Sequence, residues 1–141
     1  MKRSERLDPI VRLAQRNESD AARRCLDSRR DLDGIETRLG DLRRARGEYL
    51  ALLSEPAGMS GPRMREIRQF LSQLDAAIVQ FEWQVQKKRG AFERQQVLWA
   101  GTRARTQALG NVVARHQTSE RNALETREQR EIDDRSARPR N

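Results

Sequence analysis

Few side chains in this sequence are of the kinds that make or break covalent bonds. Its single histidine, His116, and its single cysteine, Cys25, lie far apart, and no nucleophile or carboxylate pattern accompanies either of them. Both fall at positions where a helical repeat predicts burial, and a buried thiol behaves as a small apolar group. Neither a phosphate-binding glycine loop nor a Cys/His metal-ligand spacing occurs. We therefore expect a protein that is not an enzyme and that needs no metal or cofactor.

The other chemistry that the sequence offers is electrostatic. The net charge is +8, and between residues 87 and 115 seven cations face Glu93 alone, a local net charge of +6. This basic zone comprises Lys87, Lys88, Arg89, Arg94, Arg103, Arg105 and Arg115. Binding of nucleic acid would call for free aromatic side chains that stack on bases, but Phe92 and Trp99 belong to the apolar repeat. We therefore favour an acidic protein surface over nucleic acid as the partner.

The composition indicates which elements present these charges. Charged residues make up 35% of the 141 positions and aromatic residues only 4%, a mixture typical of long helices with a narrow apolar stripe. Asp8-Pro9 predicts a helix start, and the segment from Ser54 to Pro62, with two prolines and two glycines, predicts a turn. We predict an all-α fold of one unit, a long antiparallel two-helix coiled coil (helical hairpin) with the second helix longer. Its parts are a helix over 8–54, a hinge over 55–62, a helix over 63–135 and a tail over 136–141.

Apolar residues recur with the seven-residue repeat of a coiled-coil seam in both predicted helices. In the first helix the seam runs through Leu7, Val11, Ala14, Glu18, Ala21, Cys25, Ser28, Leu32, Ile35, Leu39, Leu42, Arg46, Tyr49 and Leu53. In the second it runs through Met64, Ile67, Leu71, Leu74, Ile78, Phe81, Val85, Lys88, Phe92, Gln95, Trp99, Thr102, Thr106, Leu109, Val113 and His116. In an antiparallel pair, facing residues then have numbers that add up to 120, such as Leu39 and Phe81. Beyond about residue 114 the second helix has no partner in the first.

One flank of the seam is apolar close to the hinge. The heptad g positions set Leu52 beside Phe70, Ala45 beside Ala77 and Arg38 beside Gln84, and Trp83 lies nearby. The apolar members of this flank and of its border, called the apolar strip below, are Leu42, Ala45, Tyr49, Leu52, Phe70, Leu74, Ala77 and Phe81. Two interpretations stay open. The strip is a protein-binding surface, or it broadens the core of the coiled coil.

Several short segments stand in a distinctive order around the hinge. They are Asp20-Ala21-Ala22-Arg23, Gly47-Glu48-Tyr49, Gln69-Phe70-Leu71-Ser72-Gln73-Leu74-Asp75-Ala76-Ala77-Ile78, Trp99, and Arg127-Glu128-Gln129-Arg130-Glu131-Ile132-Asp133-Asp134. In their order, their spacing about the hinge and the total length, they resemble the flagellar export protein FliJ over nearly the whole chain.

The resemblance implies a non-enzymatic stalk protein of the flagellar type III export apparatus. FliJ-like proteins associate with the hexameric export ATPase FliI, engage the membrane-embedded export gate component FlhA, and help recycle the chaperones of export substrates. It therefore implies a cytoplasmic protein at the flagellar base, held at the inner membrane by its partners. No apolar run in the sequence is long enough to span a membrane, and the basic start of the chain leads into no apolar segment of a signal peptide.

Carried over by position, the gate contact would fall on Arg38, Leu42, Ala45, Tyr49, Phe70, Leu74, Ala77 and Phe81. Arg38 and Ala45 depart from the family, which more often has uncharged polar and aromatic side chains there. Charge and apolar surface are segregated along the chain, so we hypothesise that the basic zone contacts the ATPase ring. The residues of that contact would be Lys87, Lys88, Arg89, Arg94, Arg103 and Arg105.

Three other functions fit the same sequence pattern. The stalk protein of a virulence type III secretion system has the same architecture. A basic coiled-coil nucleic-acid-binding protein predicts DNA binding with a steep dependence on salt. A structural homodimer could form through Cys25 or through the apolar strip.

Overall fold

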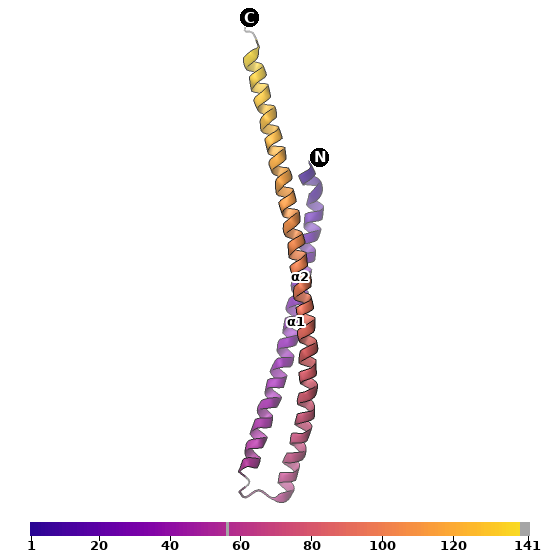
Figure 1. Ribbon diagram of the computed structural model, residues 1–141, viewed down its shortest axis with the longest axis vertical. Helices are drawn as coiled ribbons and strands as arrows, with labels where there is room; N and C mark the ends of the chain where they lie inside the picture. The colour runs from indigo at the N-terminus through magenta and orange to yellow at the C-terminus, as the bar shows by residue number, and fades with distance from the viewer. Residues whose placement is uncertain (56, 139–141) are drawn as a thin grey trace. The chain divides into compact units, whose positions relative to one another are not determined.

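The computed structural model describes residues 1–55 and 57–138. Pro56 of the predicted hinge and residues 139–141 of the predicted tail lie outside the described residues. The described chain contains two helices, α1 (Arg3–Ser54) and α2 (Gly61–Ala137), and no strand. They pack against each other as an antiparallel hairpin (Figure 1), and α2 is the longer at 77 residues against 52. The predicted all-α two-helix fold is confirmed.

The start of α1 differs from the prediction. The helix begins at Arg3 rather than at residue 8, so Asp8 and Pro9 lie inside it, and Asp8 pairs with Arg12 at 2.6 Å. Glu5 Oε2 accepts a hydrogen bond from the backbone N–H of Lys2 at 3.3 Å. A glutamate three residues into a helix that binds the N-cap N–H in this way is half of a capping box, which stabilises the first turn. The helix therefore starts ahead of the proline.

The connection between the helices shows why α2 starts where it does. Gly58 has a φ of 82°, a left-handed backbone conformation that glycine adopts without the steric cost of a side chain. The hydroxyl of Ser60 accepts a hydrogen bond from the N–H of Arg63 at 3.3 Å, which makes Ser60 the N-cap. α2 accordingly begins at Gly61, two residues before the predicted start, and ends at Ala137 rather than at 135.

The chain divides into two compact units, each with segments of both helices: unit 1 is Met1–Ala21 with Leu98–Asn141, and unit 2 is Ala22–Val97. The buried core of unit 2 consists of Cys25, Leu32, Leu39, Ile67, Leu71, Leu74, Ile78 and Val85, all of them predicted seam residues. Phe81 packs against the cluster that contains Leu39 and Ile78, and Leu53 packs against the cluster around Ile67. These contacts across the helices agree with the predicted register.

Unit 1 buries smaller side chains. Of its described residues, only Ala14 and Ala21 are buried hydrophobic residues, and Trp99 in the same seam is half-buried. The hydroxyl of Thr106 donates to the carbonyl oxygen of Ala14 at 3.3 Å, a contact that has the predicted register. Small side chains let the two helices approach each other but remove little apolar surface from water.

Pairing in unit 1 extends past the predicted limit near residue 114. The N–H and the hydroxyl of Ser4 donate to the two carboxylate oxygens of Glu120, at 3.2 and 2.7 Å. Because α1 starts five residues earlier than predicted, at Arg3, it reaches this part of α2. Beyond Glu120, every described residue from 121 to 138 is exposed.

Candidate functional site

The apolar strip lies within unit 2. Phe70 and Leu52 are 40% and 46% exposed, whereas Tyr49 is half-buried. The rings of Tyr49 and Phe70 meet edge to face, with centroids 4.8 Å apart and planes at 61°. This arrangement is the favourable one for an aromatic pair and fixes the orientation of both rings. The strip thus presents a pre-ordered aromatic pair whose outer member is accessible.

The remaining strip residues lie at different depths. Leu74 is buried in the core cluster with Ile67 and Leu71. Leu42 and Phe81 are half-buried and pack against the core, and Ala45 and Ala77 are also half-buried. Arg38 is exposed at the edge farthest from the hinge. The strip therefore broadens the core through its inner residues and leaves Phe70 and Leu52 as its most accessible apolar side chains.

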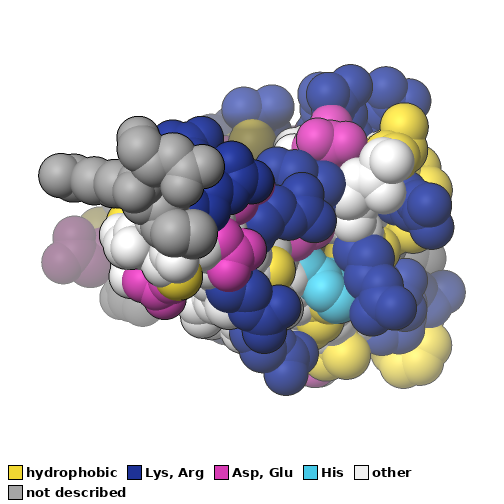
Figure 2. Space-filling model, turned by 90° about the horizontal axis from the view of Figure 1, so that it is seen from above, with side chains coloured by type: hydrophobic (Ala, Val, Ile, Leu, Met, Phe, Trp, Pro, Cys, Tyr) yellow, Lys and Arg dark blue, Asp and Glu magenta, His cyan; other side chains and the backbone are white. Residues whose placement is uncertain are grey.

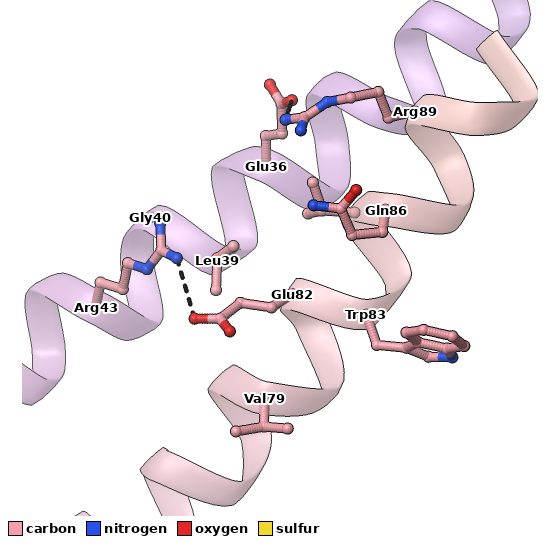
Figure 3. A pocket seen from close by; sticks show the side chains of 10 residues that line it. Glu36, Leu39, Gly40, Arg43, Val79, Glu82, Trp83, Gln86 and Arg89 are labelled. Atoms are coloured by element: carbon pink, nitrogen blue, oxygen red, sulfur yellow. Dashed lines mark hydrogen bonds and ion pairs between the residues drawn. The ribbon is translucent and has the colours of Figure 1, made fainter. Parts of the chain in front are cut away.

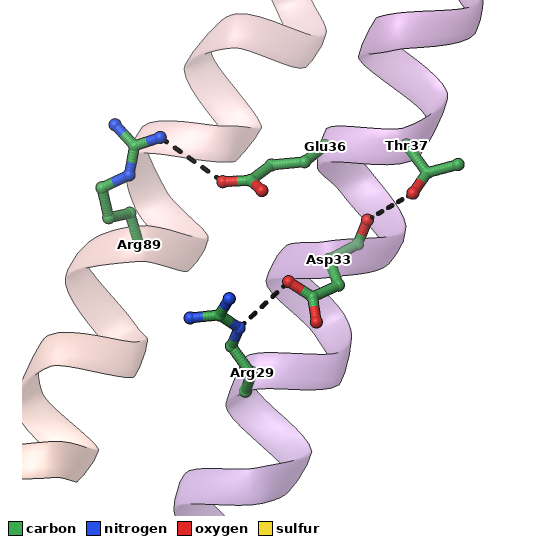
Figure 4. Close-up of polar contacts among 5 residues, drawn as sticks. All are labelled: Arg29, Asp33, Glu36, Thr37 and Arg89. Carbon is green, nitrogen blue, oxygen red and sulfur yellow. Dashed lines mark hydrogen bonds and ion pairs between the residues drawn. The ribbon is translucent and has the colours of Figure 1, made fainter.

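On the opposite flank of unit 2, ion pairs link the two helices. Arg89 meets Glu36 at 3.4 Å (Figure 4), and Arg43 meets Glu82 at 3.1 Å. These four residues occupy the heptad e positions. Sequence reasoning missed these pairs, because the register sets the positions opposite each other but does not show which side chains meet. Such exposed pairs contribute little stability, but they make the two flanks chemically different.

The part of the basic zone in unit 2 is only partly free to bind a partner. Lys88 meets Asp31 at 3.7 Å, and Arg89 is engaged with Glu36. Lys87 lies over the ring of Trp83, with its Nζ 5.3 Å from the centroid. Within the described residues Lys87 and Arg94 form no ion pair, so they carry the uncompensated charge here.

In unit 1 the basic zone is exposed. The guanidinium of Arg103 lies over Trp99, 5.2 Å from the ring centroid, and Arg105 and Arg115 are exposed. No described carboxylate lies within ion-pair distance of these three arginines. In the end-on view of Figure 2, Lys and Arg side chains are prominent among acidic and apolar ones, and the single histidine is visible. Arg103, Arg105 and Arg115 add exposed positive charge to unit 1. This surface suits an anionic partner.

The carboxyl of Glu120 has a lowered pKa. The hydrogen bond from the Ser4 hydroxyl to its carboxylate lowers the pKa of Glu120 below the ordinary 4.5, and the charges of Lys2 and His116 act in the same direction. Hydrogen bonds to a carboxylate favour its charged form. The contact joins the first turn of α1 to α2 within unit 1.

The residues that could do covalent chemistry are not brought together. Cys25 is buried in the seam of unit 2, and His116 is half-buried in unit 1. No group of three or more His, Cys, Asp or Glu side chains among the described residues is placed to hold a metal ion. Neither described helix contains a stretch that is long and apolar enough to cross a membrane.

The comparison with protein families decides what kind of protein carries these surfaces. The family described as "Flagellar FliJ protein" matches residues 2–139, almost the entire chain. The chain belongs to the FliJ family. No curated protein and no solved structure matches it. As a FliJ-family member it is a stalk-type protein of flagellar type III export, and the family is a non-enzymatic component of that apparatus.

Proposed function

We propose that this FliJ-family protein couples the export ATPase ring to the membrane export gate and escorts the chaperones of export substrates. The observation that carries the proposal is the ordered Tyr49–Phe70 pair on an apolar flank of unit 2. Arg103 and Arg105 of unit 1, which form no ion pair with any residue that the structure describes, supply a separate, cationic surface. The apolar strip would bind a FlhA-like gate protein, and the basic zone would bind a FliI-like ATPase hexamer. The protein would then sit at the inner membrane only through its partners.

The gate contact is tested with Phe70→Asp and Ala77→Asp in one chain. A carboxylate on a surface that loses water on binding costs free energy, because the charge gives up its hydration without finding a partner. We expect binding to the cytoplasmic part of the gate protein to weaken by about tenfold or more, measured by calorimetry. Far-UV circular dichroism should be unchanged.

A matched control for this experiment lies on the other flank. Val79→Asp, compared with Phe70→Asp alone, adds the same charge to a more exposed side chain of α2 and should leave gate binding intact. If the double variant loses helicity, the strip residues serve only to pack the core of the coiled coil. If Val79→Asp weakens gate binding equally, the contact lies elsewhere.

The ATPase contact is tested by reversing Arg94, Arg103 and Arg105 to Glu. Cationic surfaces speed association with anionic partners, so we expect weaker stimulation of ATP hydrolysis by the export ATPase. Reversal of Arg63, Arg65 and Arg68 changes the net charge by the same amount near the hinge and should have a smaller effect. Equal effects of the two triple variants would contradict a specific role for the basic zone.

Duplex DNA should be titrated at the same salt concentration as the ATPase. A FliJ-type stalk predicts stimulated ATP hydrolysis with ring assembly. Tight DNA binding that falls steeply with salt, together with no effect on the ATPase, would instead favour a nucleic-acid-binding protein.

A further inference from the structure

Unit 2 carries a groove on the flank opposite the apolar strip. It has a volume of about 790 Å³ and lies between α1 and α2. Its lining includes the buried Leu39 and Val85, and the ion-paired Arg43 and Glu82 stand at its edge (Figure 3). The groove thus has an apolar floor, and charges at its rim that already have partners.

Two apolar side chains of α2 border the groove and remain exposed. Val79 is 64% exposed and Trp83 is 63% exposed, and the indole of Trp83 points away from α1 (Figure 3). Trp83 thus lies on the flank opposite the apolar strip and not beside the strip as predicted. On the α1 side, Gly40 lines the groove, and apart from its chain neighbours and its own helix backbone no atom lies within 4 Å of the place where a side chain at this position would begin. The missing side chain leaves open space beside the groove. An exposed tryptophan next to such space is typical of an interface residue.

Along α2 itself few charges flank Trp83, and the charged residues that line the groove form two ion pairs, Arg43–Glu82 and Arg89–Glu36. Between residues 69 and 86 of α2 the charged residues are Asp75 and Glu82, and both pair with arginines of α1, Arg46 and Arg43. The outer face of α1 is different, because charged side chains recur along it. They are Asp27, Arg30, Asp33, Asp41, Arg44 and Glu48. An exposed aromatic residue bordered by charges that are already paired with each other suits a protein interface.

The apolar residues on this face of α2 follow a helical repeat of their own. Ala76, Val79 and Trp83 are spaced by three and four residues, which is the spacing of a coiled-coil seam, and Glu93 ends the uncharged part of the stripe. The seam that packs against α1 uses other positions, so this second stripe has no partner within the described chain. A stripe with this repeat is complementary to another α-helix.

Charge at one edge of the stripe indicates the chemistry of that helix. Lys87 lies over Trp83, and Arg94 follows it two turns later on the same side of α2. Neither makes an ion pair with a described residue. A second copy of this chain would bring its own cations and its own net charge of +8 to the contact. Acidic residues on an approaching helix would pair with both cations.

We propose that this groove binds an amphipathic α-helix of a partner protein. The apolar stripe of that helix packs on Val79 and Trp83, and acidic residues along one of its edges face Lys87 and Arg94. The site lies on the flank opposite the apolar strip, so both surfaces can be occupied at once. Binding here is distinct from the gate contact, and the two are separable by mutation.

The experiment uses the full chain with Trp99→Phe, which leaves Trp83 as the only tryptophan. The probes are designed helical peptides, about 15 residues long, with a leucine stripe flanked by either Glu or Lys. We expect the Glu-flanked peptide to shift Trp83 fluorescence to shorter wavelength and to bind at least roughly tenfold more tightly than the Lys-flanked one. A peptide of the same composition without the stripe should not bind.

Three variants locate the site. Val79→Glu should weaken binding of the Glu-flanked peptide by about tenfold or more, because it places a like charge in the apolar stripe. Val97→Glu adds the same charge to a side chain that is 73% exposed and lies outside the groove, and Ala77→Glu adds it to the opposite flank. Both control variants should retain peptide binding, and Ala77→Glu should still weaken binding to the gate protein.

Equal binding of the Glu-flanked and Lys-flanked peptides would overturn the proposal, as would full binding by Val79→Glu. A concentration-dependent dimer in sedimentation equilibrium that Val79→Glu abolishes would show that a second copy occupies the groove, which also overturns it. Failure of the gate experiment alone leaves these readouts unchanged, because they involve the other flank.

Discussion

Unit 2 and unit 1 are built on the same heptad repeat but from side chains of different size. In unit 2 the seam buries Leu32, Leu39 and Ile78, whereas in unit 1 the buried seam residues are Ala14 and Ala21. Burial of a leucine or isoleucine removes far more apolar surface from water than burial of an alanine. We infer that the pairing of α1 with α2 is strong in unit 2 and weak in unit 1, where polar contacts such as Ser4–Glu120 supplement it.

The difference also separates the two candidate binding surfaces. Unit 2 holds the apolar strip, whose geometry depends on a well-packed core beneath it. Unit 1 holds Arg103, Arg105 and Arg115, whose attraction for an anionic partner does not require a fixed arrangement. Shape recognition needs a rigid scaffold, whereas charge attraction acts over a distance and tolerates motion.

The largest expected effect is on the free energy of unfolding, when an apolar seam side chain is truncated to alanine in each unit. Ile78→Ala should lower the free energy of unfolding by about 2–5 kcal/mol, because it leaves a cavity in the core of unit 2. Leu109→Ala removes a half-buried seam residue of unit 1 and should cost only about 1–2 kcal/mol. Urea unfolding followed by circular dichroism measures both. Equal losses would show that the two units are packed equally well.

A smaller effect is expected from glycines inside the helices. Apart from the chain neighbours and the helix's own backbone, nothing lies within 4 Å of the side-chain position at Gly40 in unit 2 or at Gly101 in unit 1. Replacement by alanine should therefore stabilise each helix by about 0.5–1 kcal/mol. We expect Gly40→Ala to raise the main thermal midpoint and Gly101→Ala chiefly to slow hydrogen exchange within unit 1.

The hinge glycine provides the control for this pair. Gly58→Ala should lower the midpoint instead, because an alanine is strained at a φ of 82°. If Gly101→Ala moves the main midpoint as far as Gly40→Ala does, unit 1 does not open separately.

The smallest effect concerns pH. The pKa of Glu120 is lowered below 4.5 by the hydrogen bond from Ser4, so the ionised carboxylate stabilises the folded contact. That stabilisation is present above the ordinary value and is lost as the pH falls through the lowered one. We expect the Ser4 amide to lose its protection on acidification, measured by NMR, with little change in the rest of the chain.

Glu120→Gln is the matched variant for the pH experiment, since it keeps the shape of the side chain but does not titrate in this range. In this variant, the pH dependence of hydrogen exchange at the Ser4 amide should show no acid transition due to residue 120. Persistence of the transition in this variant would assign it to another carboxylate, such as Glu5 beside the first turn.

Seam periodicity predicted most of the fold. The buried residues of unit 2 all lie at predicted positions, and contacts such as Phe81 with the Leu39 cluster have the predicted register. Prediction failed where a local signal competed with tertiary contacts. Asp8-Pro9 has the chemistry of a helix start, but Glu5 caps an earlier turn and Glu120 holds it from α2.

The sequence indicated where the apolar strip and the basic zone lie along the chain, but not how deeply each side chain is buried. Heptad assignment puts Leu74 and Phe70 at the same edge, but only coordinates show that Leu74 is buried whereas Phe70 is 40% exposed. Pairing of Lys88 with Asp31 and Arg89 with Glu36 likewise depends on side-chain conformations that a sequence pattern does not contain. The groove beside Trp83 escaped sequence reasoning because it depends on space left at Gly40 of the other helix.

The rate at which Cys25 is alkylated reports how fast the seam of unit 2 opens. Cys25 is the sole thiol of the chain and is only 6% exposed in the seam of unit 2, so an alkylating reagent reaches it only when the helices part. At high reagent concentration the labelling rate equals the rate at which that seam opens. A partner that stabilises the pairing of α1 with α2 slows the labelling, and a partner that separates the helices speeds it. The measurement needs no probe added to the protein.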